Sequence, residues 1–138
     1  MRKKVFLIVS VTALLALVLC GCRGKKLPDG MDEDEVIRAG TSVMRQLADG
    51  EYEAVYNALR EDVREQTSID AIQTMMETAA EGRGSFKKVG DSMATGVTDA
   101  DEPHAIAVIR AKYEKKSVIF RIAFDTEMDL IGLDVRGR

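Results

Sequence analysis

The hydrophobic period of this chain changes once, near Gly82 and Gly84. Before these glycines, apolar residues recur at intervals of three and four, as they do on one face of an amphipathic helix. After them, apolar residues alternate with polar ones, as they do along a strand with one buried face. Helices first and strands afterwards are typical of an α+β domain, in which helices pack on one face of an antiparallel sheet.

Three helices are predicted before the change of period. The first begins near Asp32, because Glu33–Glu35 places negative charge where the helix dipole favours it, and ends at Asp49-Gly50. A shorter helix follows over residues 52–59. Ser68 is a favourable N-cap for the third, which Gly82 ends. Between them, the charged segment 60–66 is either an extra helical turn or a loop.

Four strands are predicted after the change of period. Gly90 and Gly96 weaken the first of them, and polar turns of three residues separate the last three, which predicts an antiparallel meander. In the last strand, Ile131, Leu133 and Val135 are expected on one face and Leu130 on the other. The predicted strands are Phe86–Val97, Ala105–Tyr113, Ser117–Phe124 and Met128–Val135.

The N-terminal segment is unlike the rest of the chain. Arg2, Lys3 and Lys4 precede an uncharged run of 16 residues from Val5 to Cys20. A basic start, an apolar run and small residues at its end are typical of a secretory signal peptide. The alternative is an uncleaved transmembrane anchor, but a spanning helix needs roughly 20 apolar residues.

The tetrapeptide Leu19-Cys20-Gly21-Cys22 resembles the lipobox of bacterial prolipoproteins, although Cys20 stands where Ala or Ser is commoner. The resemblance implies cleavage before Cys22 and attachment of acyl chains to that cysteine. Two acyl chains anchor a protein stably to a membrane, whereas a single chain does not. The expected location is the extracytoplasmic face of the cell membrane. In a cell with two membranes it is the outer membrane, since Arg23 is not the Asp that favours inner-membrane retention.

The chain is therefore divided into a signal peptide over residues 1–21, a lipidated cysteine with a tether over 22–31, and one α+β domain over 32–138. The tether is predicted because Gly, Pro and charge occur there without an apolar period. Its cations would each be attracted to anionic head groups by about 1 kcal/mol.

Charge and cysteine content exclude several classes of function. Cleavage removes three of the 20 basic residues, and the remaining 17 against 23 acidic residues give a formal charge of −6. Such a domain lacks the basic footprint that nucleic acid requires. Only Cys22 remains, so disulfides and thiolate metal sites are not expected. His104 is the single histidine and has no catalytic partner nearby in sequence. Neither a metal nor a cofactor is expected.

Two stretches resemble nuclear transport factor 2-like domains. They are the step between helices, Leu47–Tyr56, and the closing hairpin, Val118–Asp125 with Met128–Leu130 and Gly132-Leu133. The resemblance extends from about Asp32 to Val135 and points to a branch of small bacterial lipoproteins with a domain of unknown function. It implies a curved, cystatin-like sheet of about four strands that wraps around the helices as a cone, often with an internal pocket. It supplies no catalytic residues.

Seven residues are candidates for lining such a pocket. Met suits adaptable binding surfaces, but apolar residues at these spacings also fit a solid core. Arg110 and Arg121 lie mid-strand and either point into the cone as anion anchors or face solvent on the outer side of the sheet, the orientation that we favour. The candidates are Tyr56, Met75, Met76, Arg110, Tyr113, Phe120 and Arg121.

Three functions are consistent with this pattern. The first is a membrane-anchored, non-catalytic binding or interaction module whose partner is a small apolar molecule, a peptide or an envelope protein. The second is a small isomerase or dehydratase, in which Tyr56 or Tyr113 donates a hydrogen bond inside an apolar cavity. The third is a structural subunit that forms a homodimer through the outer face of its sheet. Because fold analogy alone supports the second, the first is preferred.

Overall fold

The computed structural model describes residues 24–138, so the predicted signal peptide and Cys22 lie outside the described residues. Within these residues, four helices come first and four strands follow, which confirms the predicted α+β order. No helix in this described part is long and apolar enough to cross a membrane. The elements are α2 (Glu33–Ala48), α3 (Tyr52–Ala58), α4 (Glu61–Arg64), α5 (Ile69–Ala80), β1 (Phe86–Val97), β2 (His104–Tyr113), β3 (Ser117–Asp125) and β4 (Leu130–Gly137).

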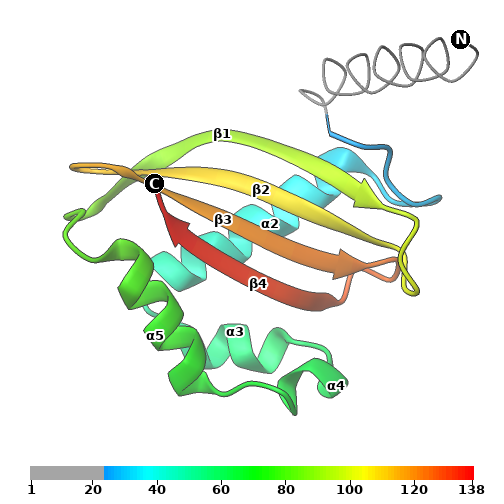
Figure 1. Cartoon of the computed structure of the whole chain (residues 1–138), viewed down its shortest axis with the longest axis horizontal. Coiled ribbons are helices and arrows are strands. Elements are labelled where there is room, and N and C mark those ends of the chain that lie inside the picture. Colours follow the sequence, from blue (N-terminus) through cyan, green and yellow to red (C-terminus); the bar gives the residue numbers. More distant parts are fainter. Residues whose placement is uncertain (1–23) are drawn as a thin grey trace, which may run out of the picture.

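The strands form one antiparallel sheet in the order β1-β2-β3-β4, which confirms the predicted meander. Helix α2 lies across one face of this sheet, and α3, α4 and α5 lie beyond β4 (Figure 1). We call the face that α2 covers the inner face. The opposite face, the outer face, carries no helix of residues 24–138 (Figure 1).

Local sequence explains where the two longer helices begin. The Asp32 carboxylate accepts a hydrogen bond of 3.0 Å from the Glu35 N–H at the start of α2. The Ser68 hydroxyl accepts one of 3.0 Å from the Ala71 N–H at the start of α5. Each cap satisfies a backbone donor that has no partner within the helix. The segment 60–66, predicted to be either an extra helical turn or a loop, contains the short helix α4.

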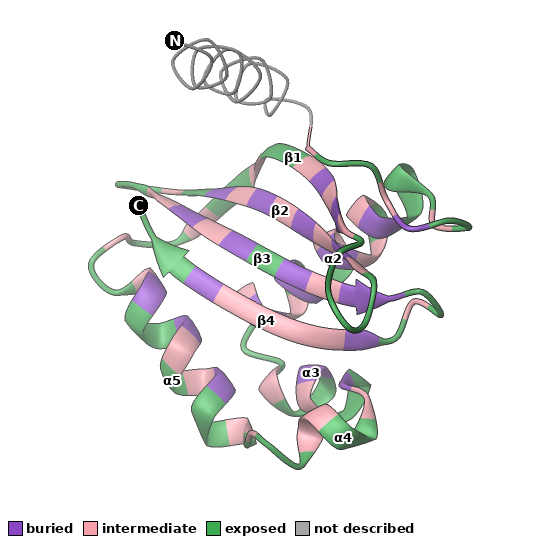
Figure 2. Cartoon of the chain, turned by 45° about the vertical axis from the view of Figure 1, so that its right-hand side comes forward, coloured by how far each residue is buried: buried purple, intermediate pink, exposed green. Residues whose placement is uncertain are grey.

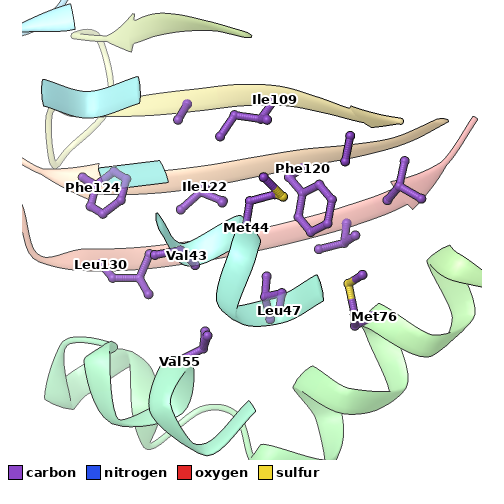
Figure 3. Packing of buried hydrophobic residues seen from close by; sticks show 14 of the residues in the cluster. Val43, Met44, Leu47, Val55, Met76, Ile109, Phe120, Ile122, Phe124 and Leu130 are labelled. Atoms are coloured by element: carbon purple, nitrogen blue, oxygen red, sulfur yellow. The ribbon is translucent and has the colours of Figure 1, made fainter. Parts of the chain in front are cut away.

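The hydrophobic core lies between α2 and the inner face of the sheet. Val36, Met44 and Leu47 of α2 are completely buried, because they recur on one helix face. They meet Ile109, Phe120 and Ile122 of the central strands, which are buried to the same extent (Figure 3).

Small residues allow α2 to approach β2 closely. A Cβ on Gly40 would lie only 2.5 Å from the Cβ of Ala107, a separation that real Cβ atoms do not adopt. On either side of Ala107, Ala105 and Ala111 are also completely buried. The distance between helix and sheet is therefore set by the absence of a side chain at position 40.

The predicted face of Leu130 is wrong, because β4 contains a β-bulge. Ala123 pairs with Gly132 while the next residue, Phe124, pairs with Leu130, so Ile131 is an extra residue in β4. One inserted residue moves the side chains before it to the other face of the sheet. Leu130 is consequently buried on the same side as Val135 and not opposite to it.

The segment 24–31, predicted to be a tether, makes specific contacts with β1. The Lys25 N–H donates a hydrogen bond of 2.9 Å to the Thr95 hydroxyl, and the Lys25 carbonyl accepts one of 3.0 Å from the Gly96 N–H. Pro28 is buried and Leu27 packs against the core. Composition indicated a linker, but these contacts cover part of the β1 edge and hold the segment on the domain.

Arg83 joins the end of α5 to the end of the chain. Its guanidinium donates hydrogen bonds to the carbonyl of Ala79 at 2.7 Å, of Ser117 at 3.0 Å and of Arg138 at 2.7 Å. The carbonyl of Ala79 lies in the last turn of the helix, where cations are favoured. One side chain thus connects α5, β3 and the last residue.

Candidate functional site

A cavity of about 230 Å³ opens between the helical segment 59–75 and β4. It is framed by Leu59 at the end of α3, by α4, by the turn into α5, by one face of α5 and by the bulged part of β4. The lining residues are Leu59, Val63, Gln66, Thr67, Ala71, Ile72, Met75, Gly132 and Leu133. We call this cavity the α5–β4 pocket.

The lining of the α5–β4 pocket is mostly apolar. Its polar side chains are Gln66 and Thr67, and no Asp, Glu, His, Lys or Arg belongs to the described lining. The Gln66 amide already donates a hydrogen bond of 3.2 Å to the Asp62 carbonyl. An apolar surface with few polar groups is suited to binding an apolar side chain or small molecule. It offers no group for proton transfer at neutral pH.

Two local features of the chain shape this pocket. Leu59 forms an isolated parallel bridge with Leu130, and the Arg60 N–H donates a hydrogen bond of 2.8 Å to the Leu130 carbonyl. These contacts attach the start of α4 to the start of β4. The bulge at Ile131 then brings Gly132 and Leu133 against α5. The pocket therefore depends on an irregularity in an edge strand.

Beside the pocket, Arg60 binds three carboxylates. Its Nε lies 2.7 Å from Oδ1 of Asp62, and its Nη1 lies 2.6 Å from Oε2 of Glu102 and 2.9 Å from Oδ2 of Asp125. Asp62 belongs to α4, Glu102 to the β1–β2 connection and Asp125 to the end of β3. We call these four residues the Arg60 cluster. It holds three segments together at one end of the sheet.

The Arg60 cluster shifts the pKa values of its members. Hydrogen bonds from Arg60 hold the pKa values of the Asp62 and Glu102 carboxyls below their usual range. Burial of Asp125 raises its pKa, but hydrogen bonds from the Asp129 N–H, from Arg60 and from the Glu127 N–H outweigh that effect and lower it. All three carboxyls are therefore ionised at neutral pH, and the pKa of Arg60 is raised.

The turn after β3 contains a group of acids that could be mistaken for a metal site. Ligand atoms of Asp125, Glu127 and Asp129 lie within 4.8 Å of one another. However, Oδ1 of Asp125 accepts hydrogen bonds of 2.9 Å from both the Glu127 and the Asp129 N–H, and Oδ2 binds Arg60. The buried carboxylate is thus engaged by a cation and two amides. The arrangement fits a closed turn better than an ion site.

The structure places the predicted pocket residues in several different surroundings. Phe120 is completely buried and Met76 nearly so, both in the core (Figure 3). Met75 alone of the seven lines the α5–β4 pocket. Tyr56 is half-buried against the core, and Tyr113 packs edge-on against Phe86 with ring centroids 5.7 Å apart. Burial raises the pKa of the Tyr113 hydroxyl.

Both candidate arginines lie on the outer face. Arg110 sits between the buried Ile109 and Ala111, and Arg121 sits between the buried Phe120 and Ile122, so alternation turns both away from the core. Nη1 of Arg110 is 3.9 Å from Asp91. This arrangement agrees with the solvent-facing orientation, and neither arginine points into the core.

The residues that do line the pocket were not selected from the sequence, apart from Met75. A signal was present, because Leu59, Val63, Thr67, Ala71 and Met75 follow one another at intervals of four. That spacing is typical of one helix face. The charges between residues 60 and 66 concealed it.

Comparison with other proteins gives a family and a fold. Residues 41–133 match DUF3887, described as a protein of unknown function. An NMR structure of a protein from Ruminococcus gnavus ATCC 29149 superposes with a TM-score of 0.68 at 22% identity, over 79% of this chain and 95% of that one. At this identity the likeness is one of fold. No curated protein matches the chain.

Proposed function

The chain belongs to the DUF3887 family of proteins of unknown function, and we propose that it is a lipid-anchored, extracytoplasmic binding module that accepts an apolar group in the α5–β4 pocket. The observation that carries this proposal is the pocket itself. Its volume of about 230 Å³ suits an apolar side chain or a small apolar molecule. Because the described lining contains no ionisable side chain, binding and not catalysis is the activity that it supports.

The anchor is proposed from the sequence around the cleavage site. The basic start, the apolar run and the tetrapeptide Leu19-Cys20-Gly21-Cys22 together favour acylation of Cys22 after removal of residues 1–21. Such a protein would bind its partner, a small molecule or another envelope protein, next to a membrane.

We assign the domain to the nuclear transport factor 2-like type of fold. Support comes from helices that precede a four-stranded antiparallel sheet and from a core enclosed between α2 and that sheet. Enzymes of this type place an acid and a base inside the cone. Tyr56 and Tyr113 are not among the residues that line the α5–β4 pocket. The isomerase alternative therefore lacks a specific observation in its favour.

Ligand titration tests the pocket. Methyl spectra of residues 22–138 carrying Cys22→Ser would be recorded with increasing indole, a small apolar probe. We expect saturable shifts of the Met75 and Leu133 methyl groups, and we expect Ala71→Phe to abolish them by filling the pocket. Ala54→Phe, on an exposed position of α3, is the matched control. Unshifted methyls, or shifts that survive Ala71→Phe, would remove the pocket from the proposal.

Labelling tests the anchor. Cells that express the full chain would be grown with radioactive palmitate, and the protein would be isolated and counted. We expect Cys22→Ser to abolish the label and to leave the precursor uncleaved. Cys20→Ser, two residues away and within the proposed signal peptide, should retain both label and cleavage. Label that persists in Cys22→Ser would contradict anchoring at this residue.

A further inference from the structure

We propose that the outer face of the sheet rests on the anionic surface of the membrane that holds the protein. This proposal rests on the proposed anchoring through Cys22, and it adds which side of the domain meets the lipid. Three features carry it: the place where the chain enters the domain, the charge of the outer face, and its half-buried apolar residues.

The described chain begins at the outer face. A Cβ on Gly24 would lie 2.9 Å from Cε of Met93 and 3.3 Å from Cβ of Thr95, two residues whose side chains alternate with that of the buried Ala94. In the sequence, Gly24 follows Cys22 by two residues. Because Lys25 is hydrogen-bonded to Thr95 and Gly96, little free chain remains between a lipid and this edge.

The outer face is basic although the domain is acidic. Residues 24–138 contain all 23 acidic residues, whereas four of the 20 basic residues precede them. Strand register nevertheless places five basic side chains on the outer face, where the acidic side chains are those of Asp91 and Asp134. Anionic head groups attract such cations, each of which raises membrane affinity about fivefold. The five are Lys88, Arg110, Lys112, Arg121 and Arg136.

Apolar residues lie between these cations. Ile106, Val108 and Ile119 are only partly buried and alternate with core residues of β2 and β3. Figure 2 shows this alternation of buried and partly buried positions along both strands. Nε of Arg110 is buried among its neighbours and has no hydrogen-bond partner in the described structure. A surface that combines cations with apolar side chains matches the interfacial zone of a bilayer, where phosphates and the first methylene groups meet.

The proposed orientation leaves the α5–β4 pocket accessible. Helix α2 covers the inner face and α5 lies beyond β4, so neither helix lies on the outer face (Figure 1), and the pocket opens between α5 and β4. With the outer face on the membrane, these helices face away from it. A ligand would therefore reach the pocket from the aqueous side.

Paramagnetic relaxation from a membrane of known composition tests the orientation. Residues 22–138 would be coupled through the Cys22 thiol to a maleimide lipid in nanodiscs of phosphatidylcholine and phosphatidylglycerol that contain a gadolinium-chelating lipid. We expect the methyl groups of Ile106, Val108 and Ile119 to relax several-fold faster than those of Ile69 in α5. Nanodiscs of phosphatidylcholine alone should reduce this difference.

Charge reversal provides the matched comparison. The double variant Arg110→Glu/Arg121→Glu should lose the selective relaxation in anionic nanodiscs, whereas Arg38→Glu/Arg64→Glu, on α2 and α4, should retain it. Unchanged core methyl signals would establish that each variant is folded. Equal relaxation on both faces, faster relaxation at Ile69, or no effect of Arg110→Glu/Arg121→Glu would overturn the proposal.

A second copy of the chain is the competing occupant of the outer face. Sedimentation of the uncoupled Cys22→Ser form that gave a dimer, broken by Ile106→Glu, would assign the face to dimerisation and overturn membrane contact. Since coupling to the nanodisc is chemical, the orientation is measured whether or not cells acylate Cys22. Missing palmitate with preserved orientation would therefore contradict only the proposed anchoring.

Discussion

Arg60 donates a hydrogen bond of 2.9 Å to Asp125, which joins the residue before α4 to the last residue of β3 across 65 positions of sequence. Asp125 is buried, with 6% of its surface exposed, and the same arginine also binds the exposed Asp62 and Glu102. The pocket-forming segment 59–67 is therefore attached to the sheet by a group of charges at its first turn.

The Arg60 cluster predicts loss of stability in acid. The folded-state pKa values of Asp62, Glu102 and Asp125 are lowered, so their contribution is complete above the ordinary values of 3.8 for Asp and 4.5 for Glu. It is lost as pH falls below these values and through the lower pKa values of the folded state. Urea unfolding between neutral pH and pH 3 should give a shallower acid slope for Arg60→Gln than for wild type. Arg38→Gln, an exposed substitution on α2, should leave the slope unchanged, and equal slopes for all three proteins would refute the prediction.

The close approach of Gly40 to Ala107 predicts that a side chain at position 40 of α2 destabilises the domain. Gly40→Ala should gain helix propensity of about 1 kcal/mol, but crowding in a packed core typically costs 1–3 kcal/mol. We expect net destabilisation of about 1 kcal/mol by thermal or urea unfolding. In a double-mutant cycle with Ala107→Gly the two substitutions should be less costly together than their sum. A Gly40→Ala variant more stable than wild type would show that the helix can move away.

The register of β3 predicts opposite outcomes for two adjacent residues. Phe120 is completely buried whereas Arg121 is exposed. Phe120→Ala should destabilise the domain by about 3–5 kcal/mol, because a large core side chain is lost and a cavity remains. Arg121→Ala should change stability by less than about 0.5 kcal/mol. Similar losses for both, measured by denaturant unfolding, would indicate a different register.

The cap at Ser68 predicts a smaller and local effect. Ser68→Ala removes the acceptor of the Ala71 N–H and should destabilise the domain by about 1 kcal/mol. Thr78→Ala, at an exposed position inside α5, should have no such cost. Hydrogen exchange of the first turn of α5 should accelerate in Ser68→Ala alone. If exchange there is unaltered, the hydroxyl is not the group that satisfies this N–H.

Much of the fold could be predicted because local rules and tertiary structure agree. The change of period placed the helices before the sheet, and Asp32 and Ser68 marked helix starts through their own hydrogen bonds. The alternation of apolar and polar residues in β3 correctly assigned Phe120 to the core and Arg121 to the opposite face of the sheet. The position of Leu130 could not be predicted, because one extra residue in a strand reverses every side chain before it.

The site was predicted poorly for a physical reason. Apolar residues in a filled core and around an open pocket follow the same period, so Phe120 and Met76 could not be distinguished from Met75. What separates them is how the segment 59–67 meets the bulge of β4, a relation between elements distant in sequence. The contacts of Lys25 with β1 could not be predicted either. The composition of residues 24–31 indicates a linker whether or not that segment packs on the domain.

The order of the elements also has a consequence during synthesis. The apolar face of α2, with Val36 and Met44, leaves the ribosome well before β2 and β3, which bury it. The core is closed only when β4 has been synthesised, and Arg83 acquires its acceptor on Arg138 after that. Until then the nascent chain exposes apolar surface, which favours aggregation.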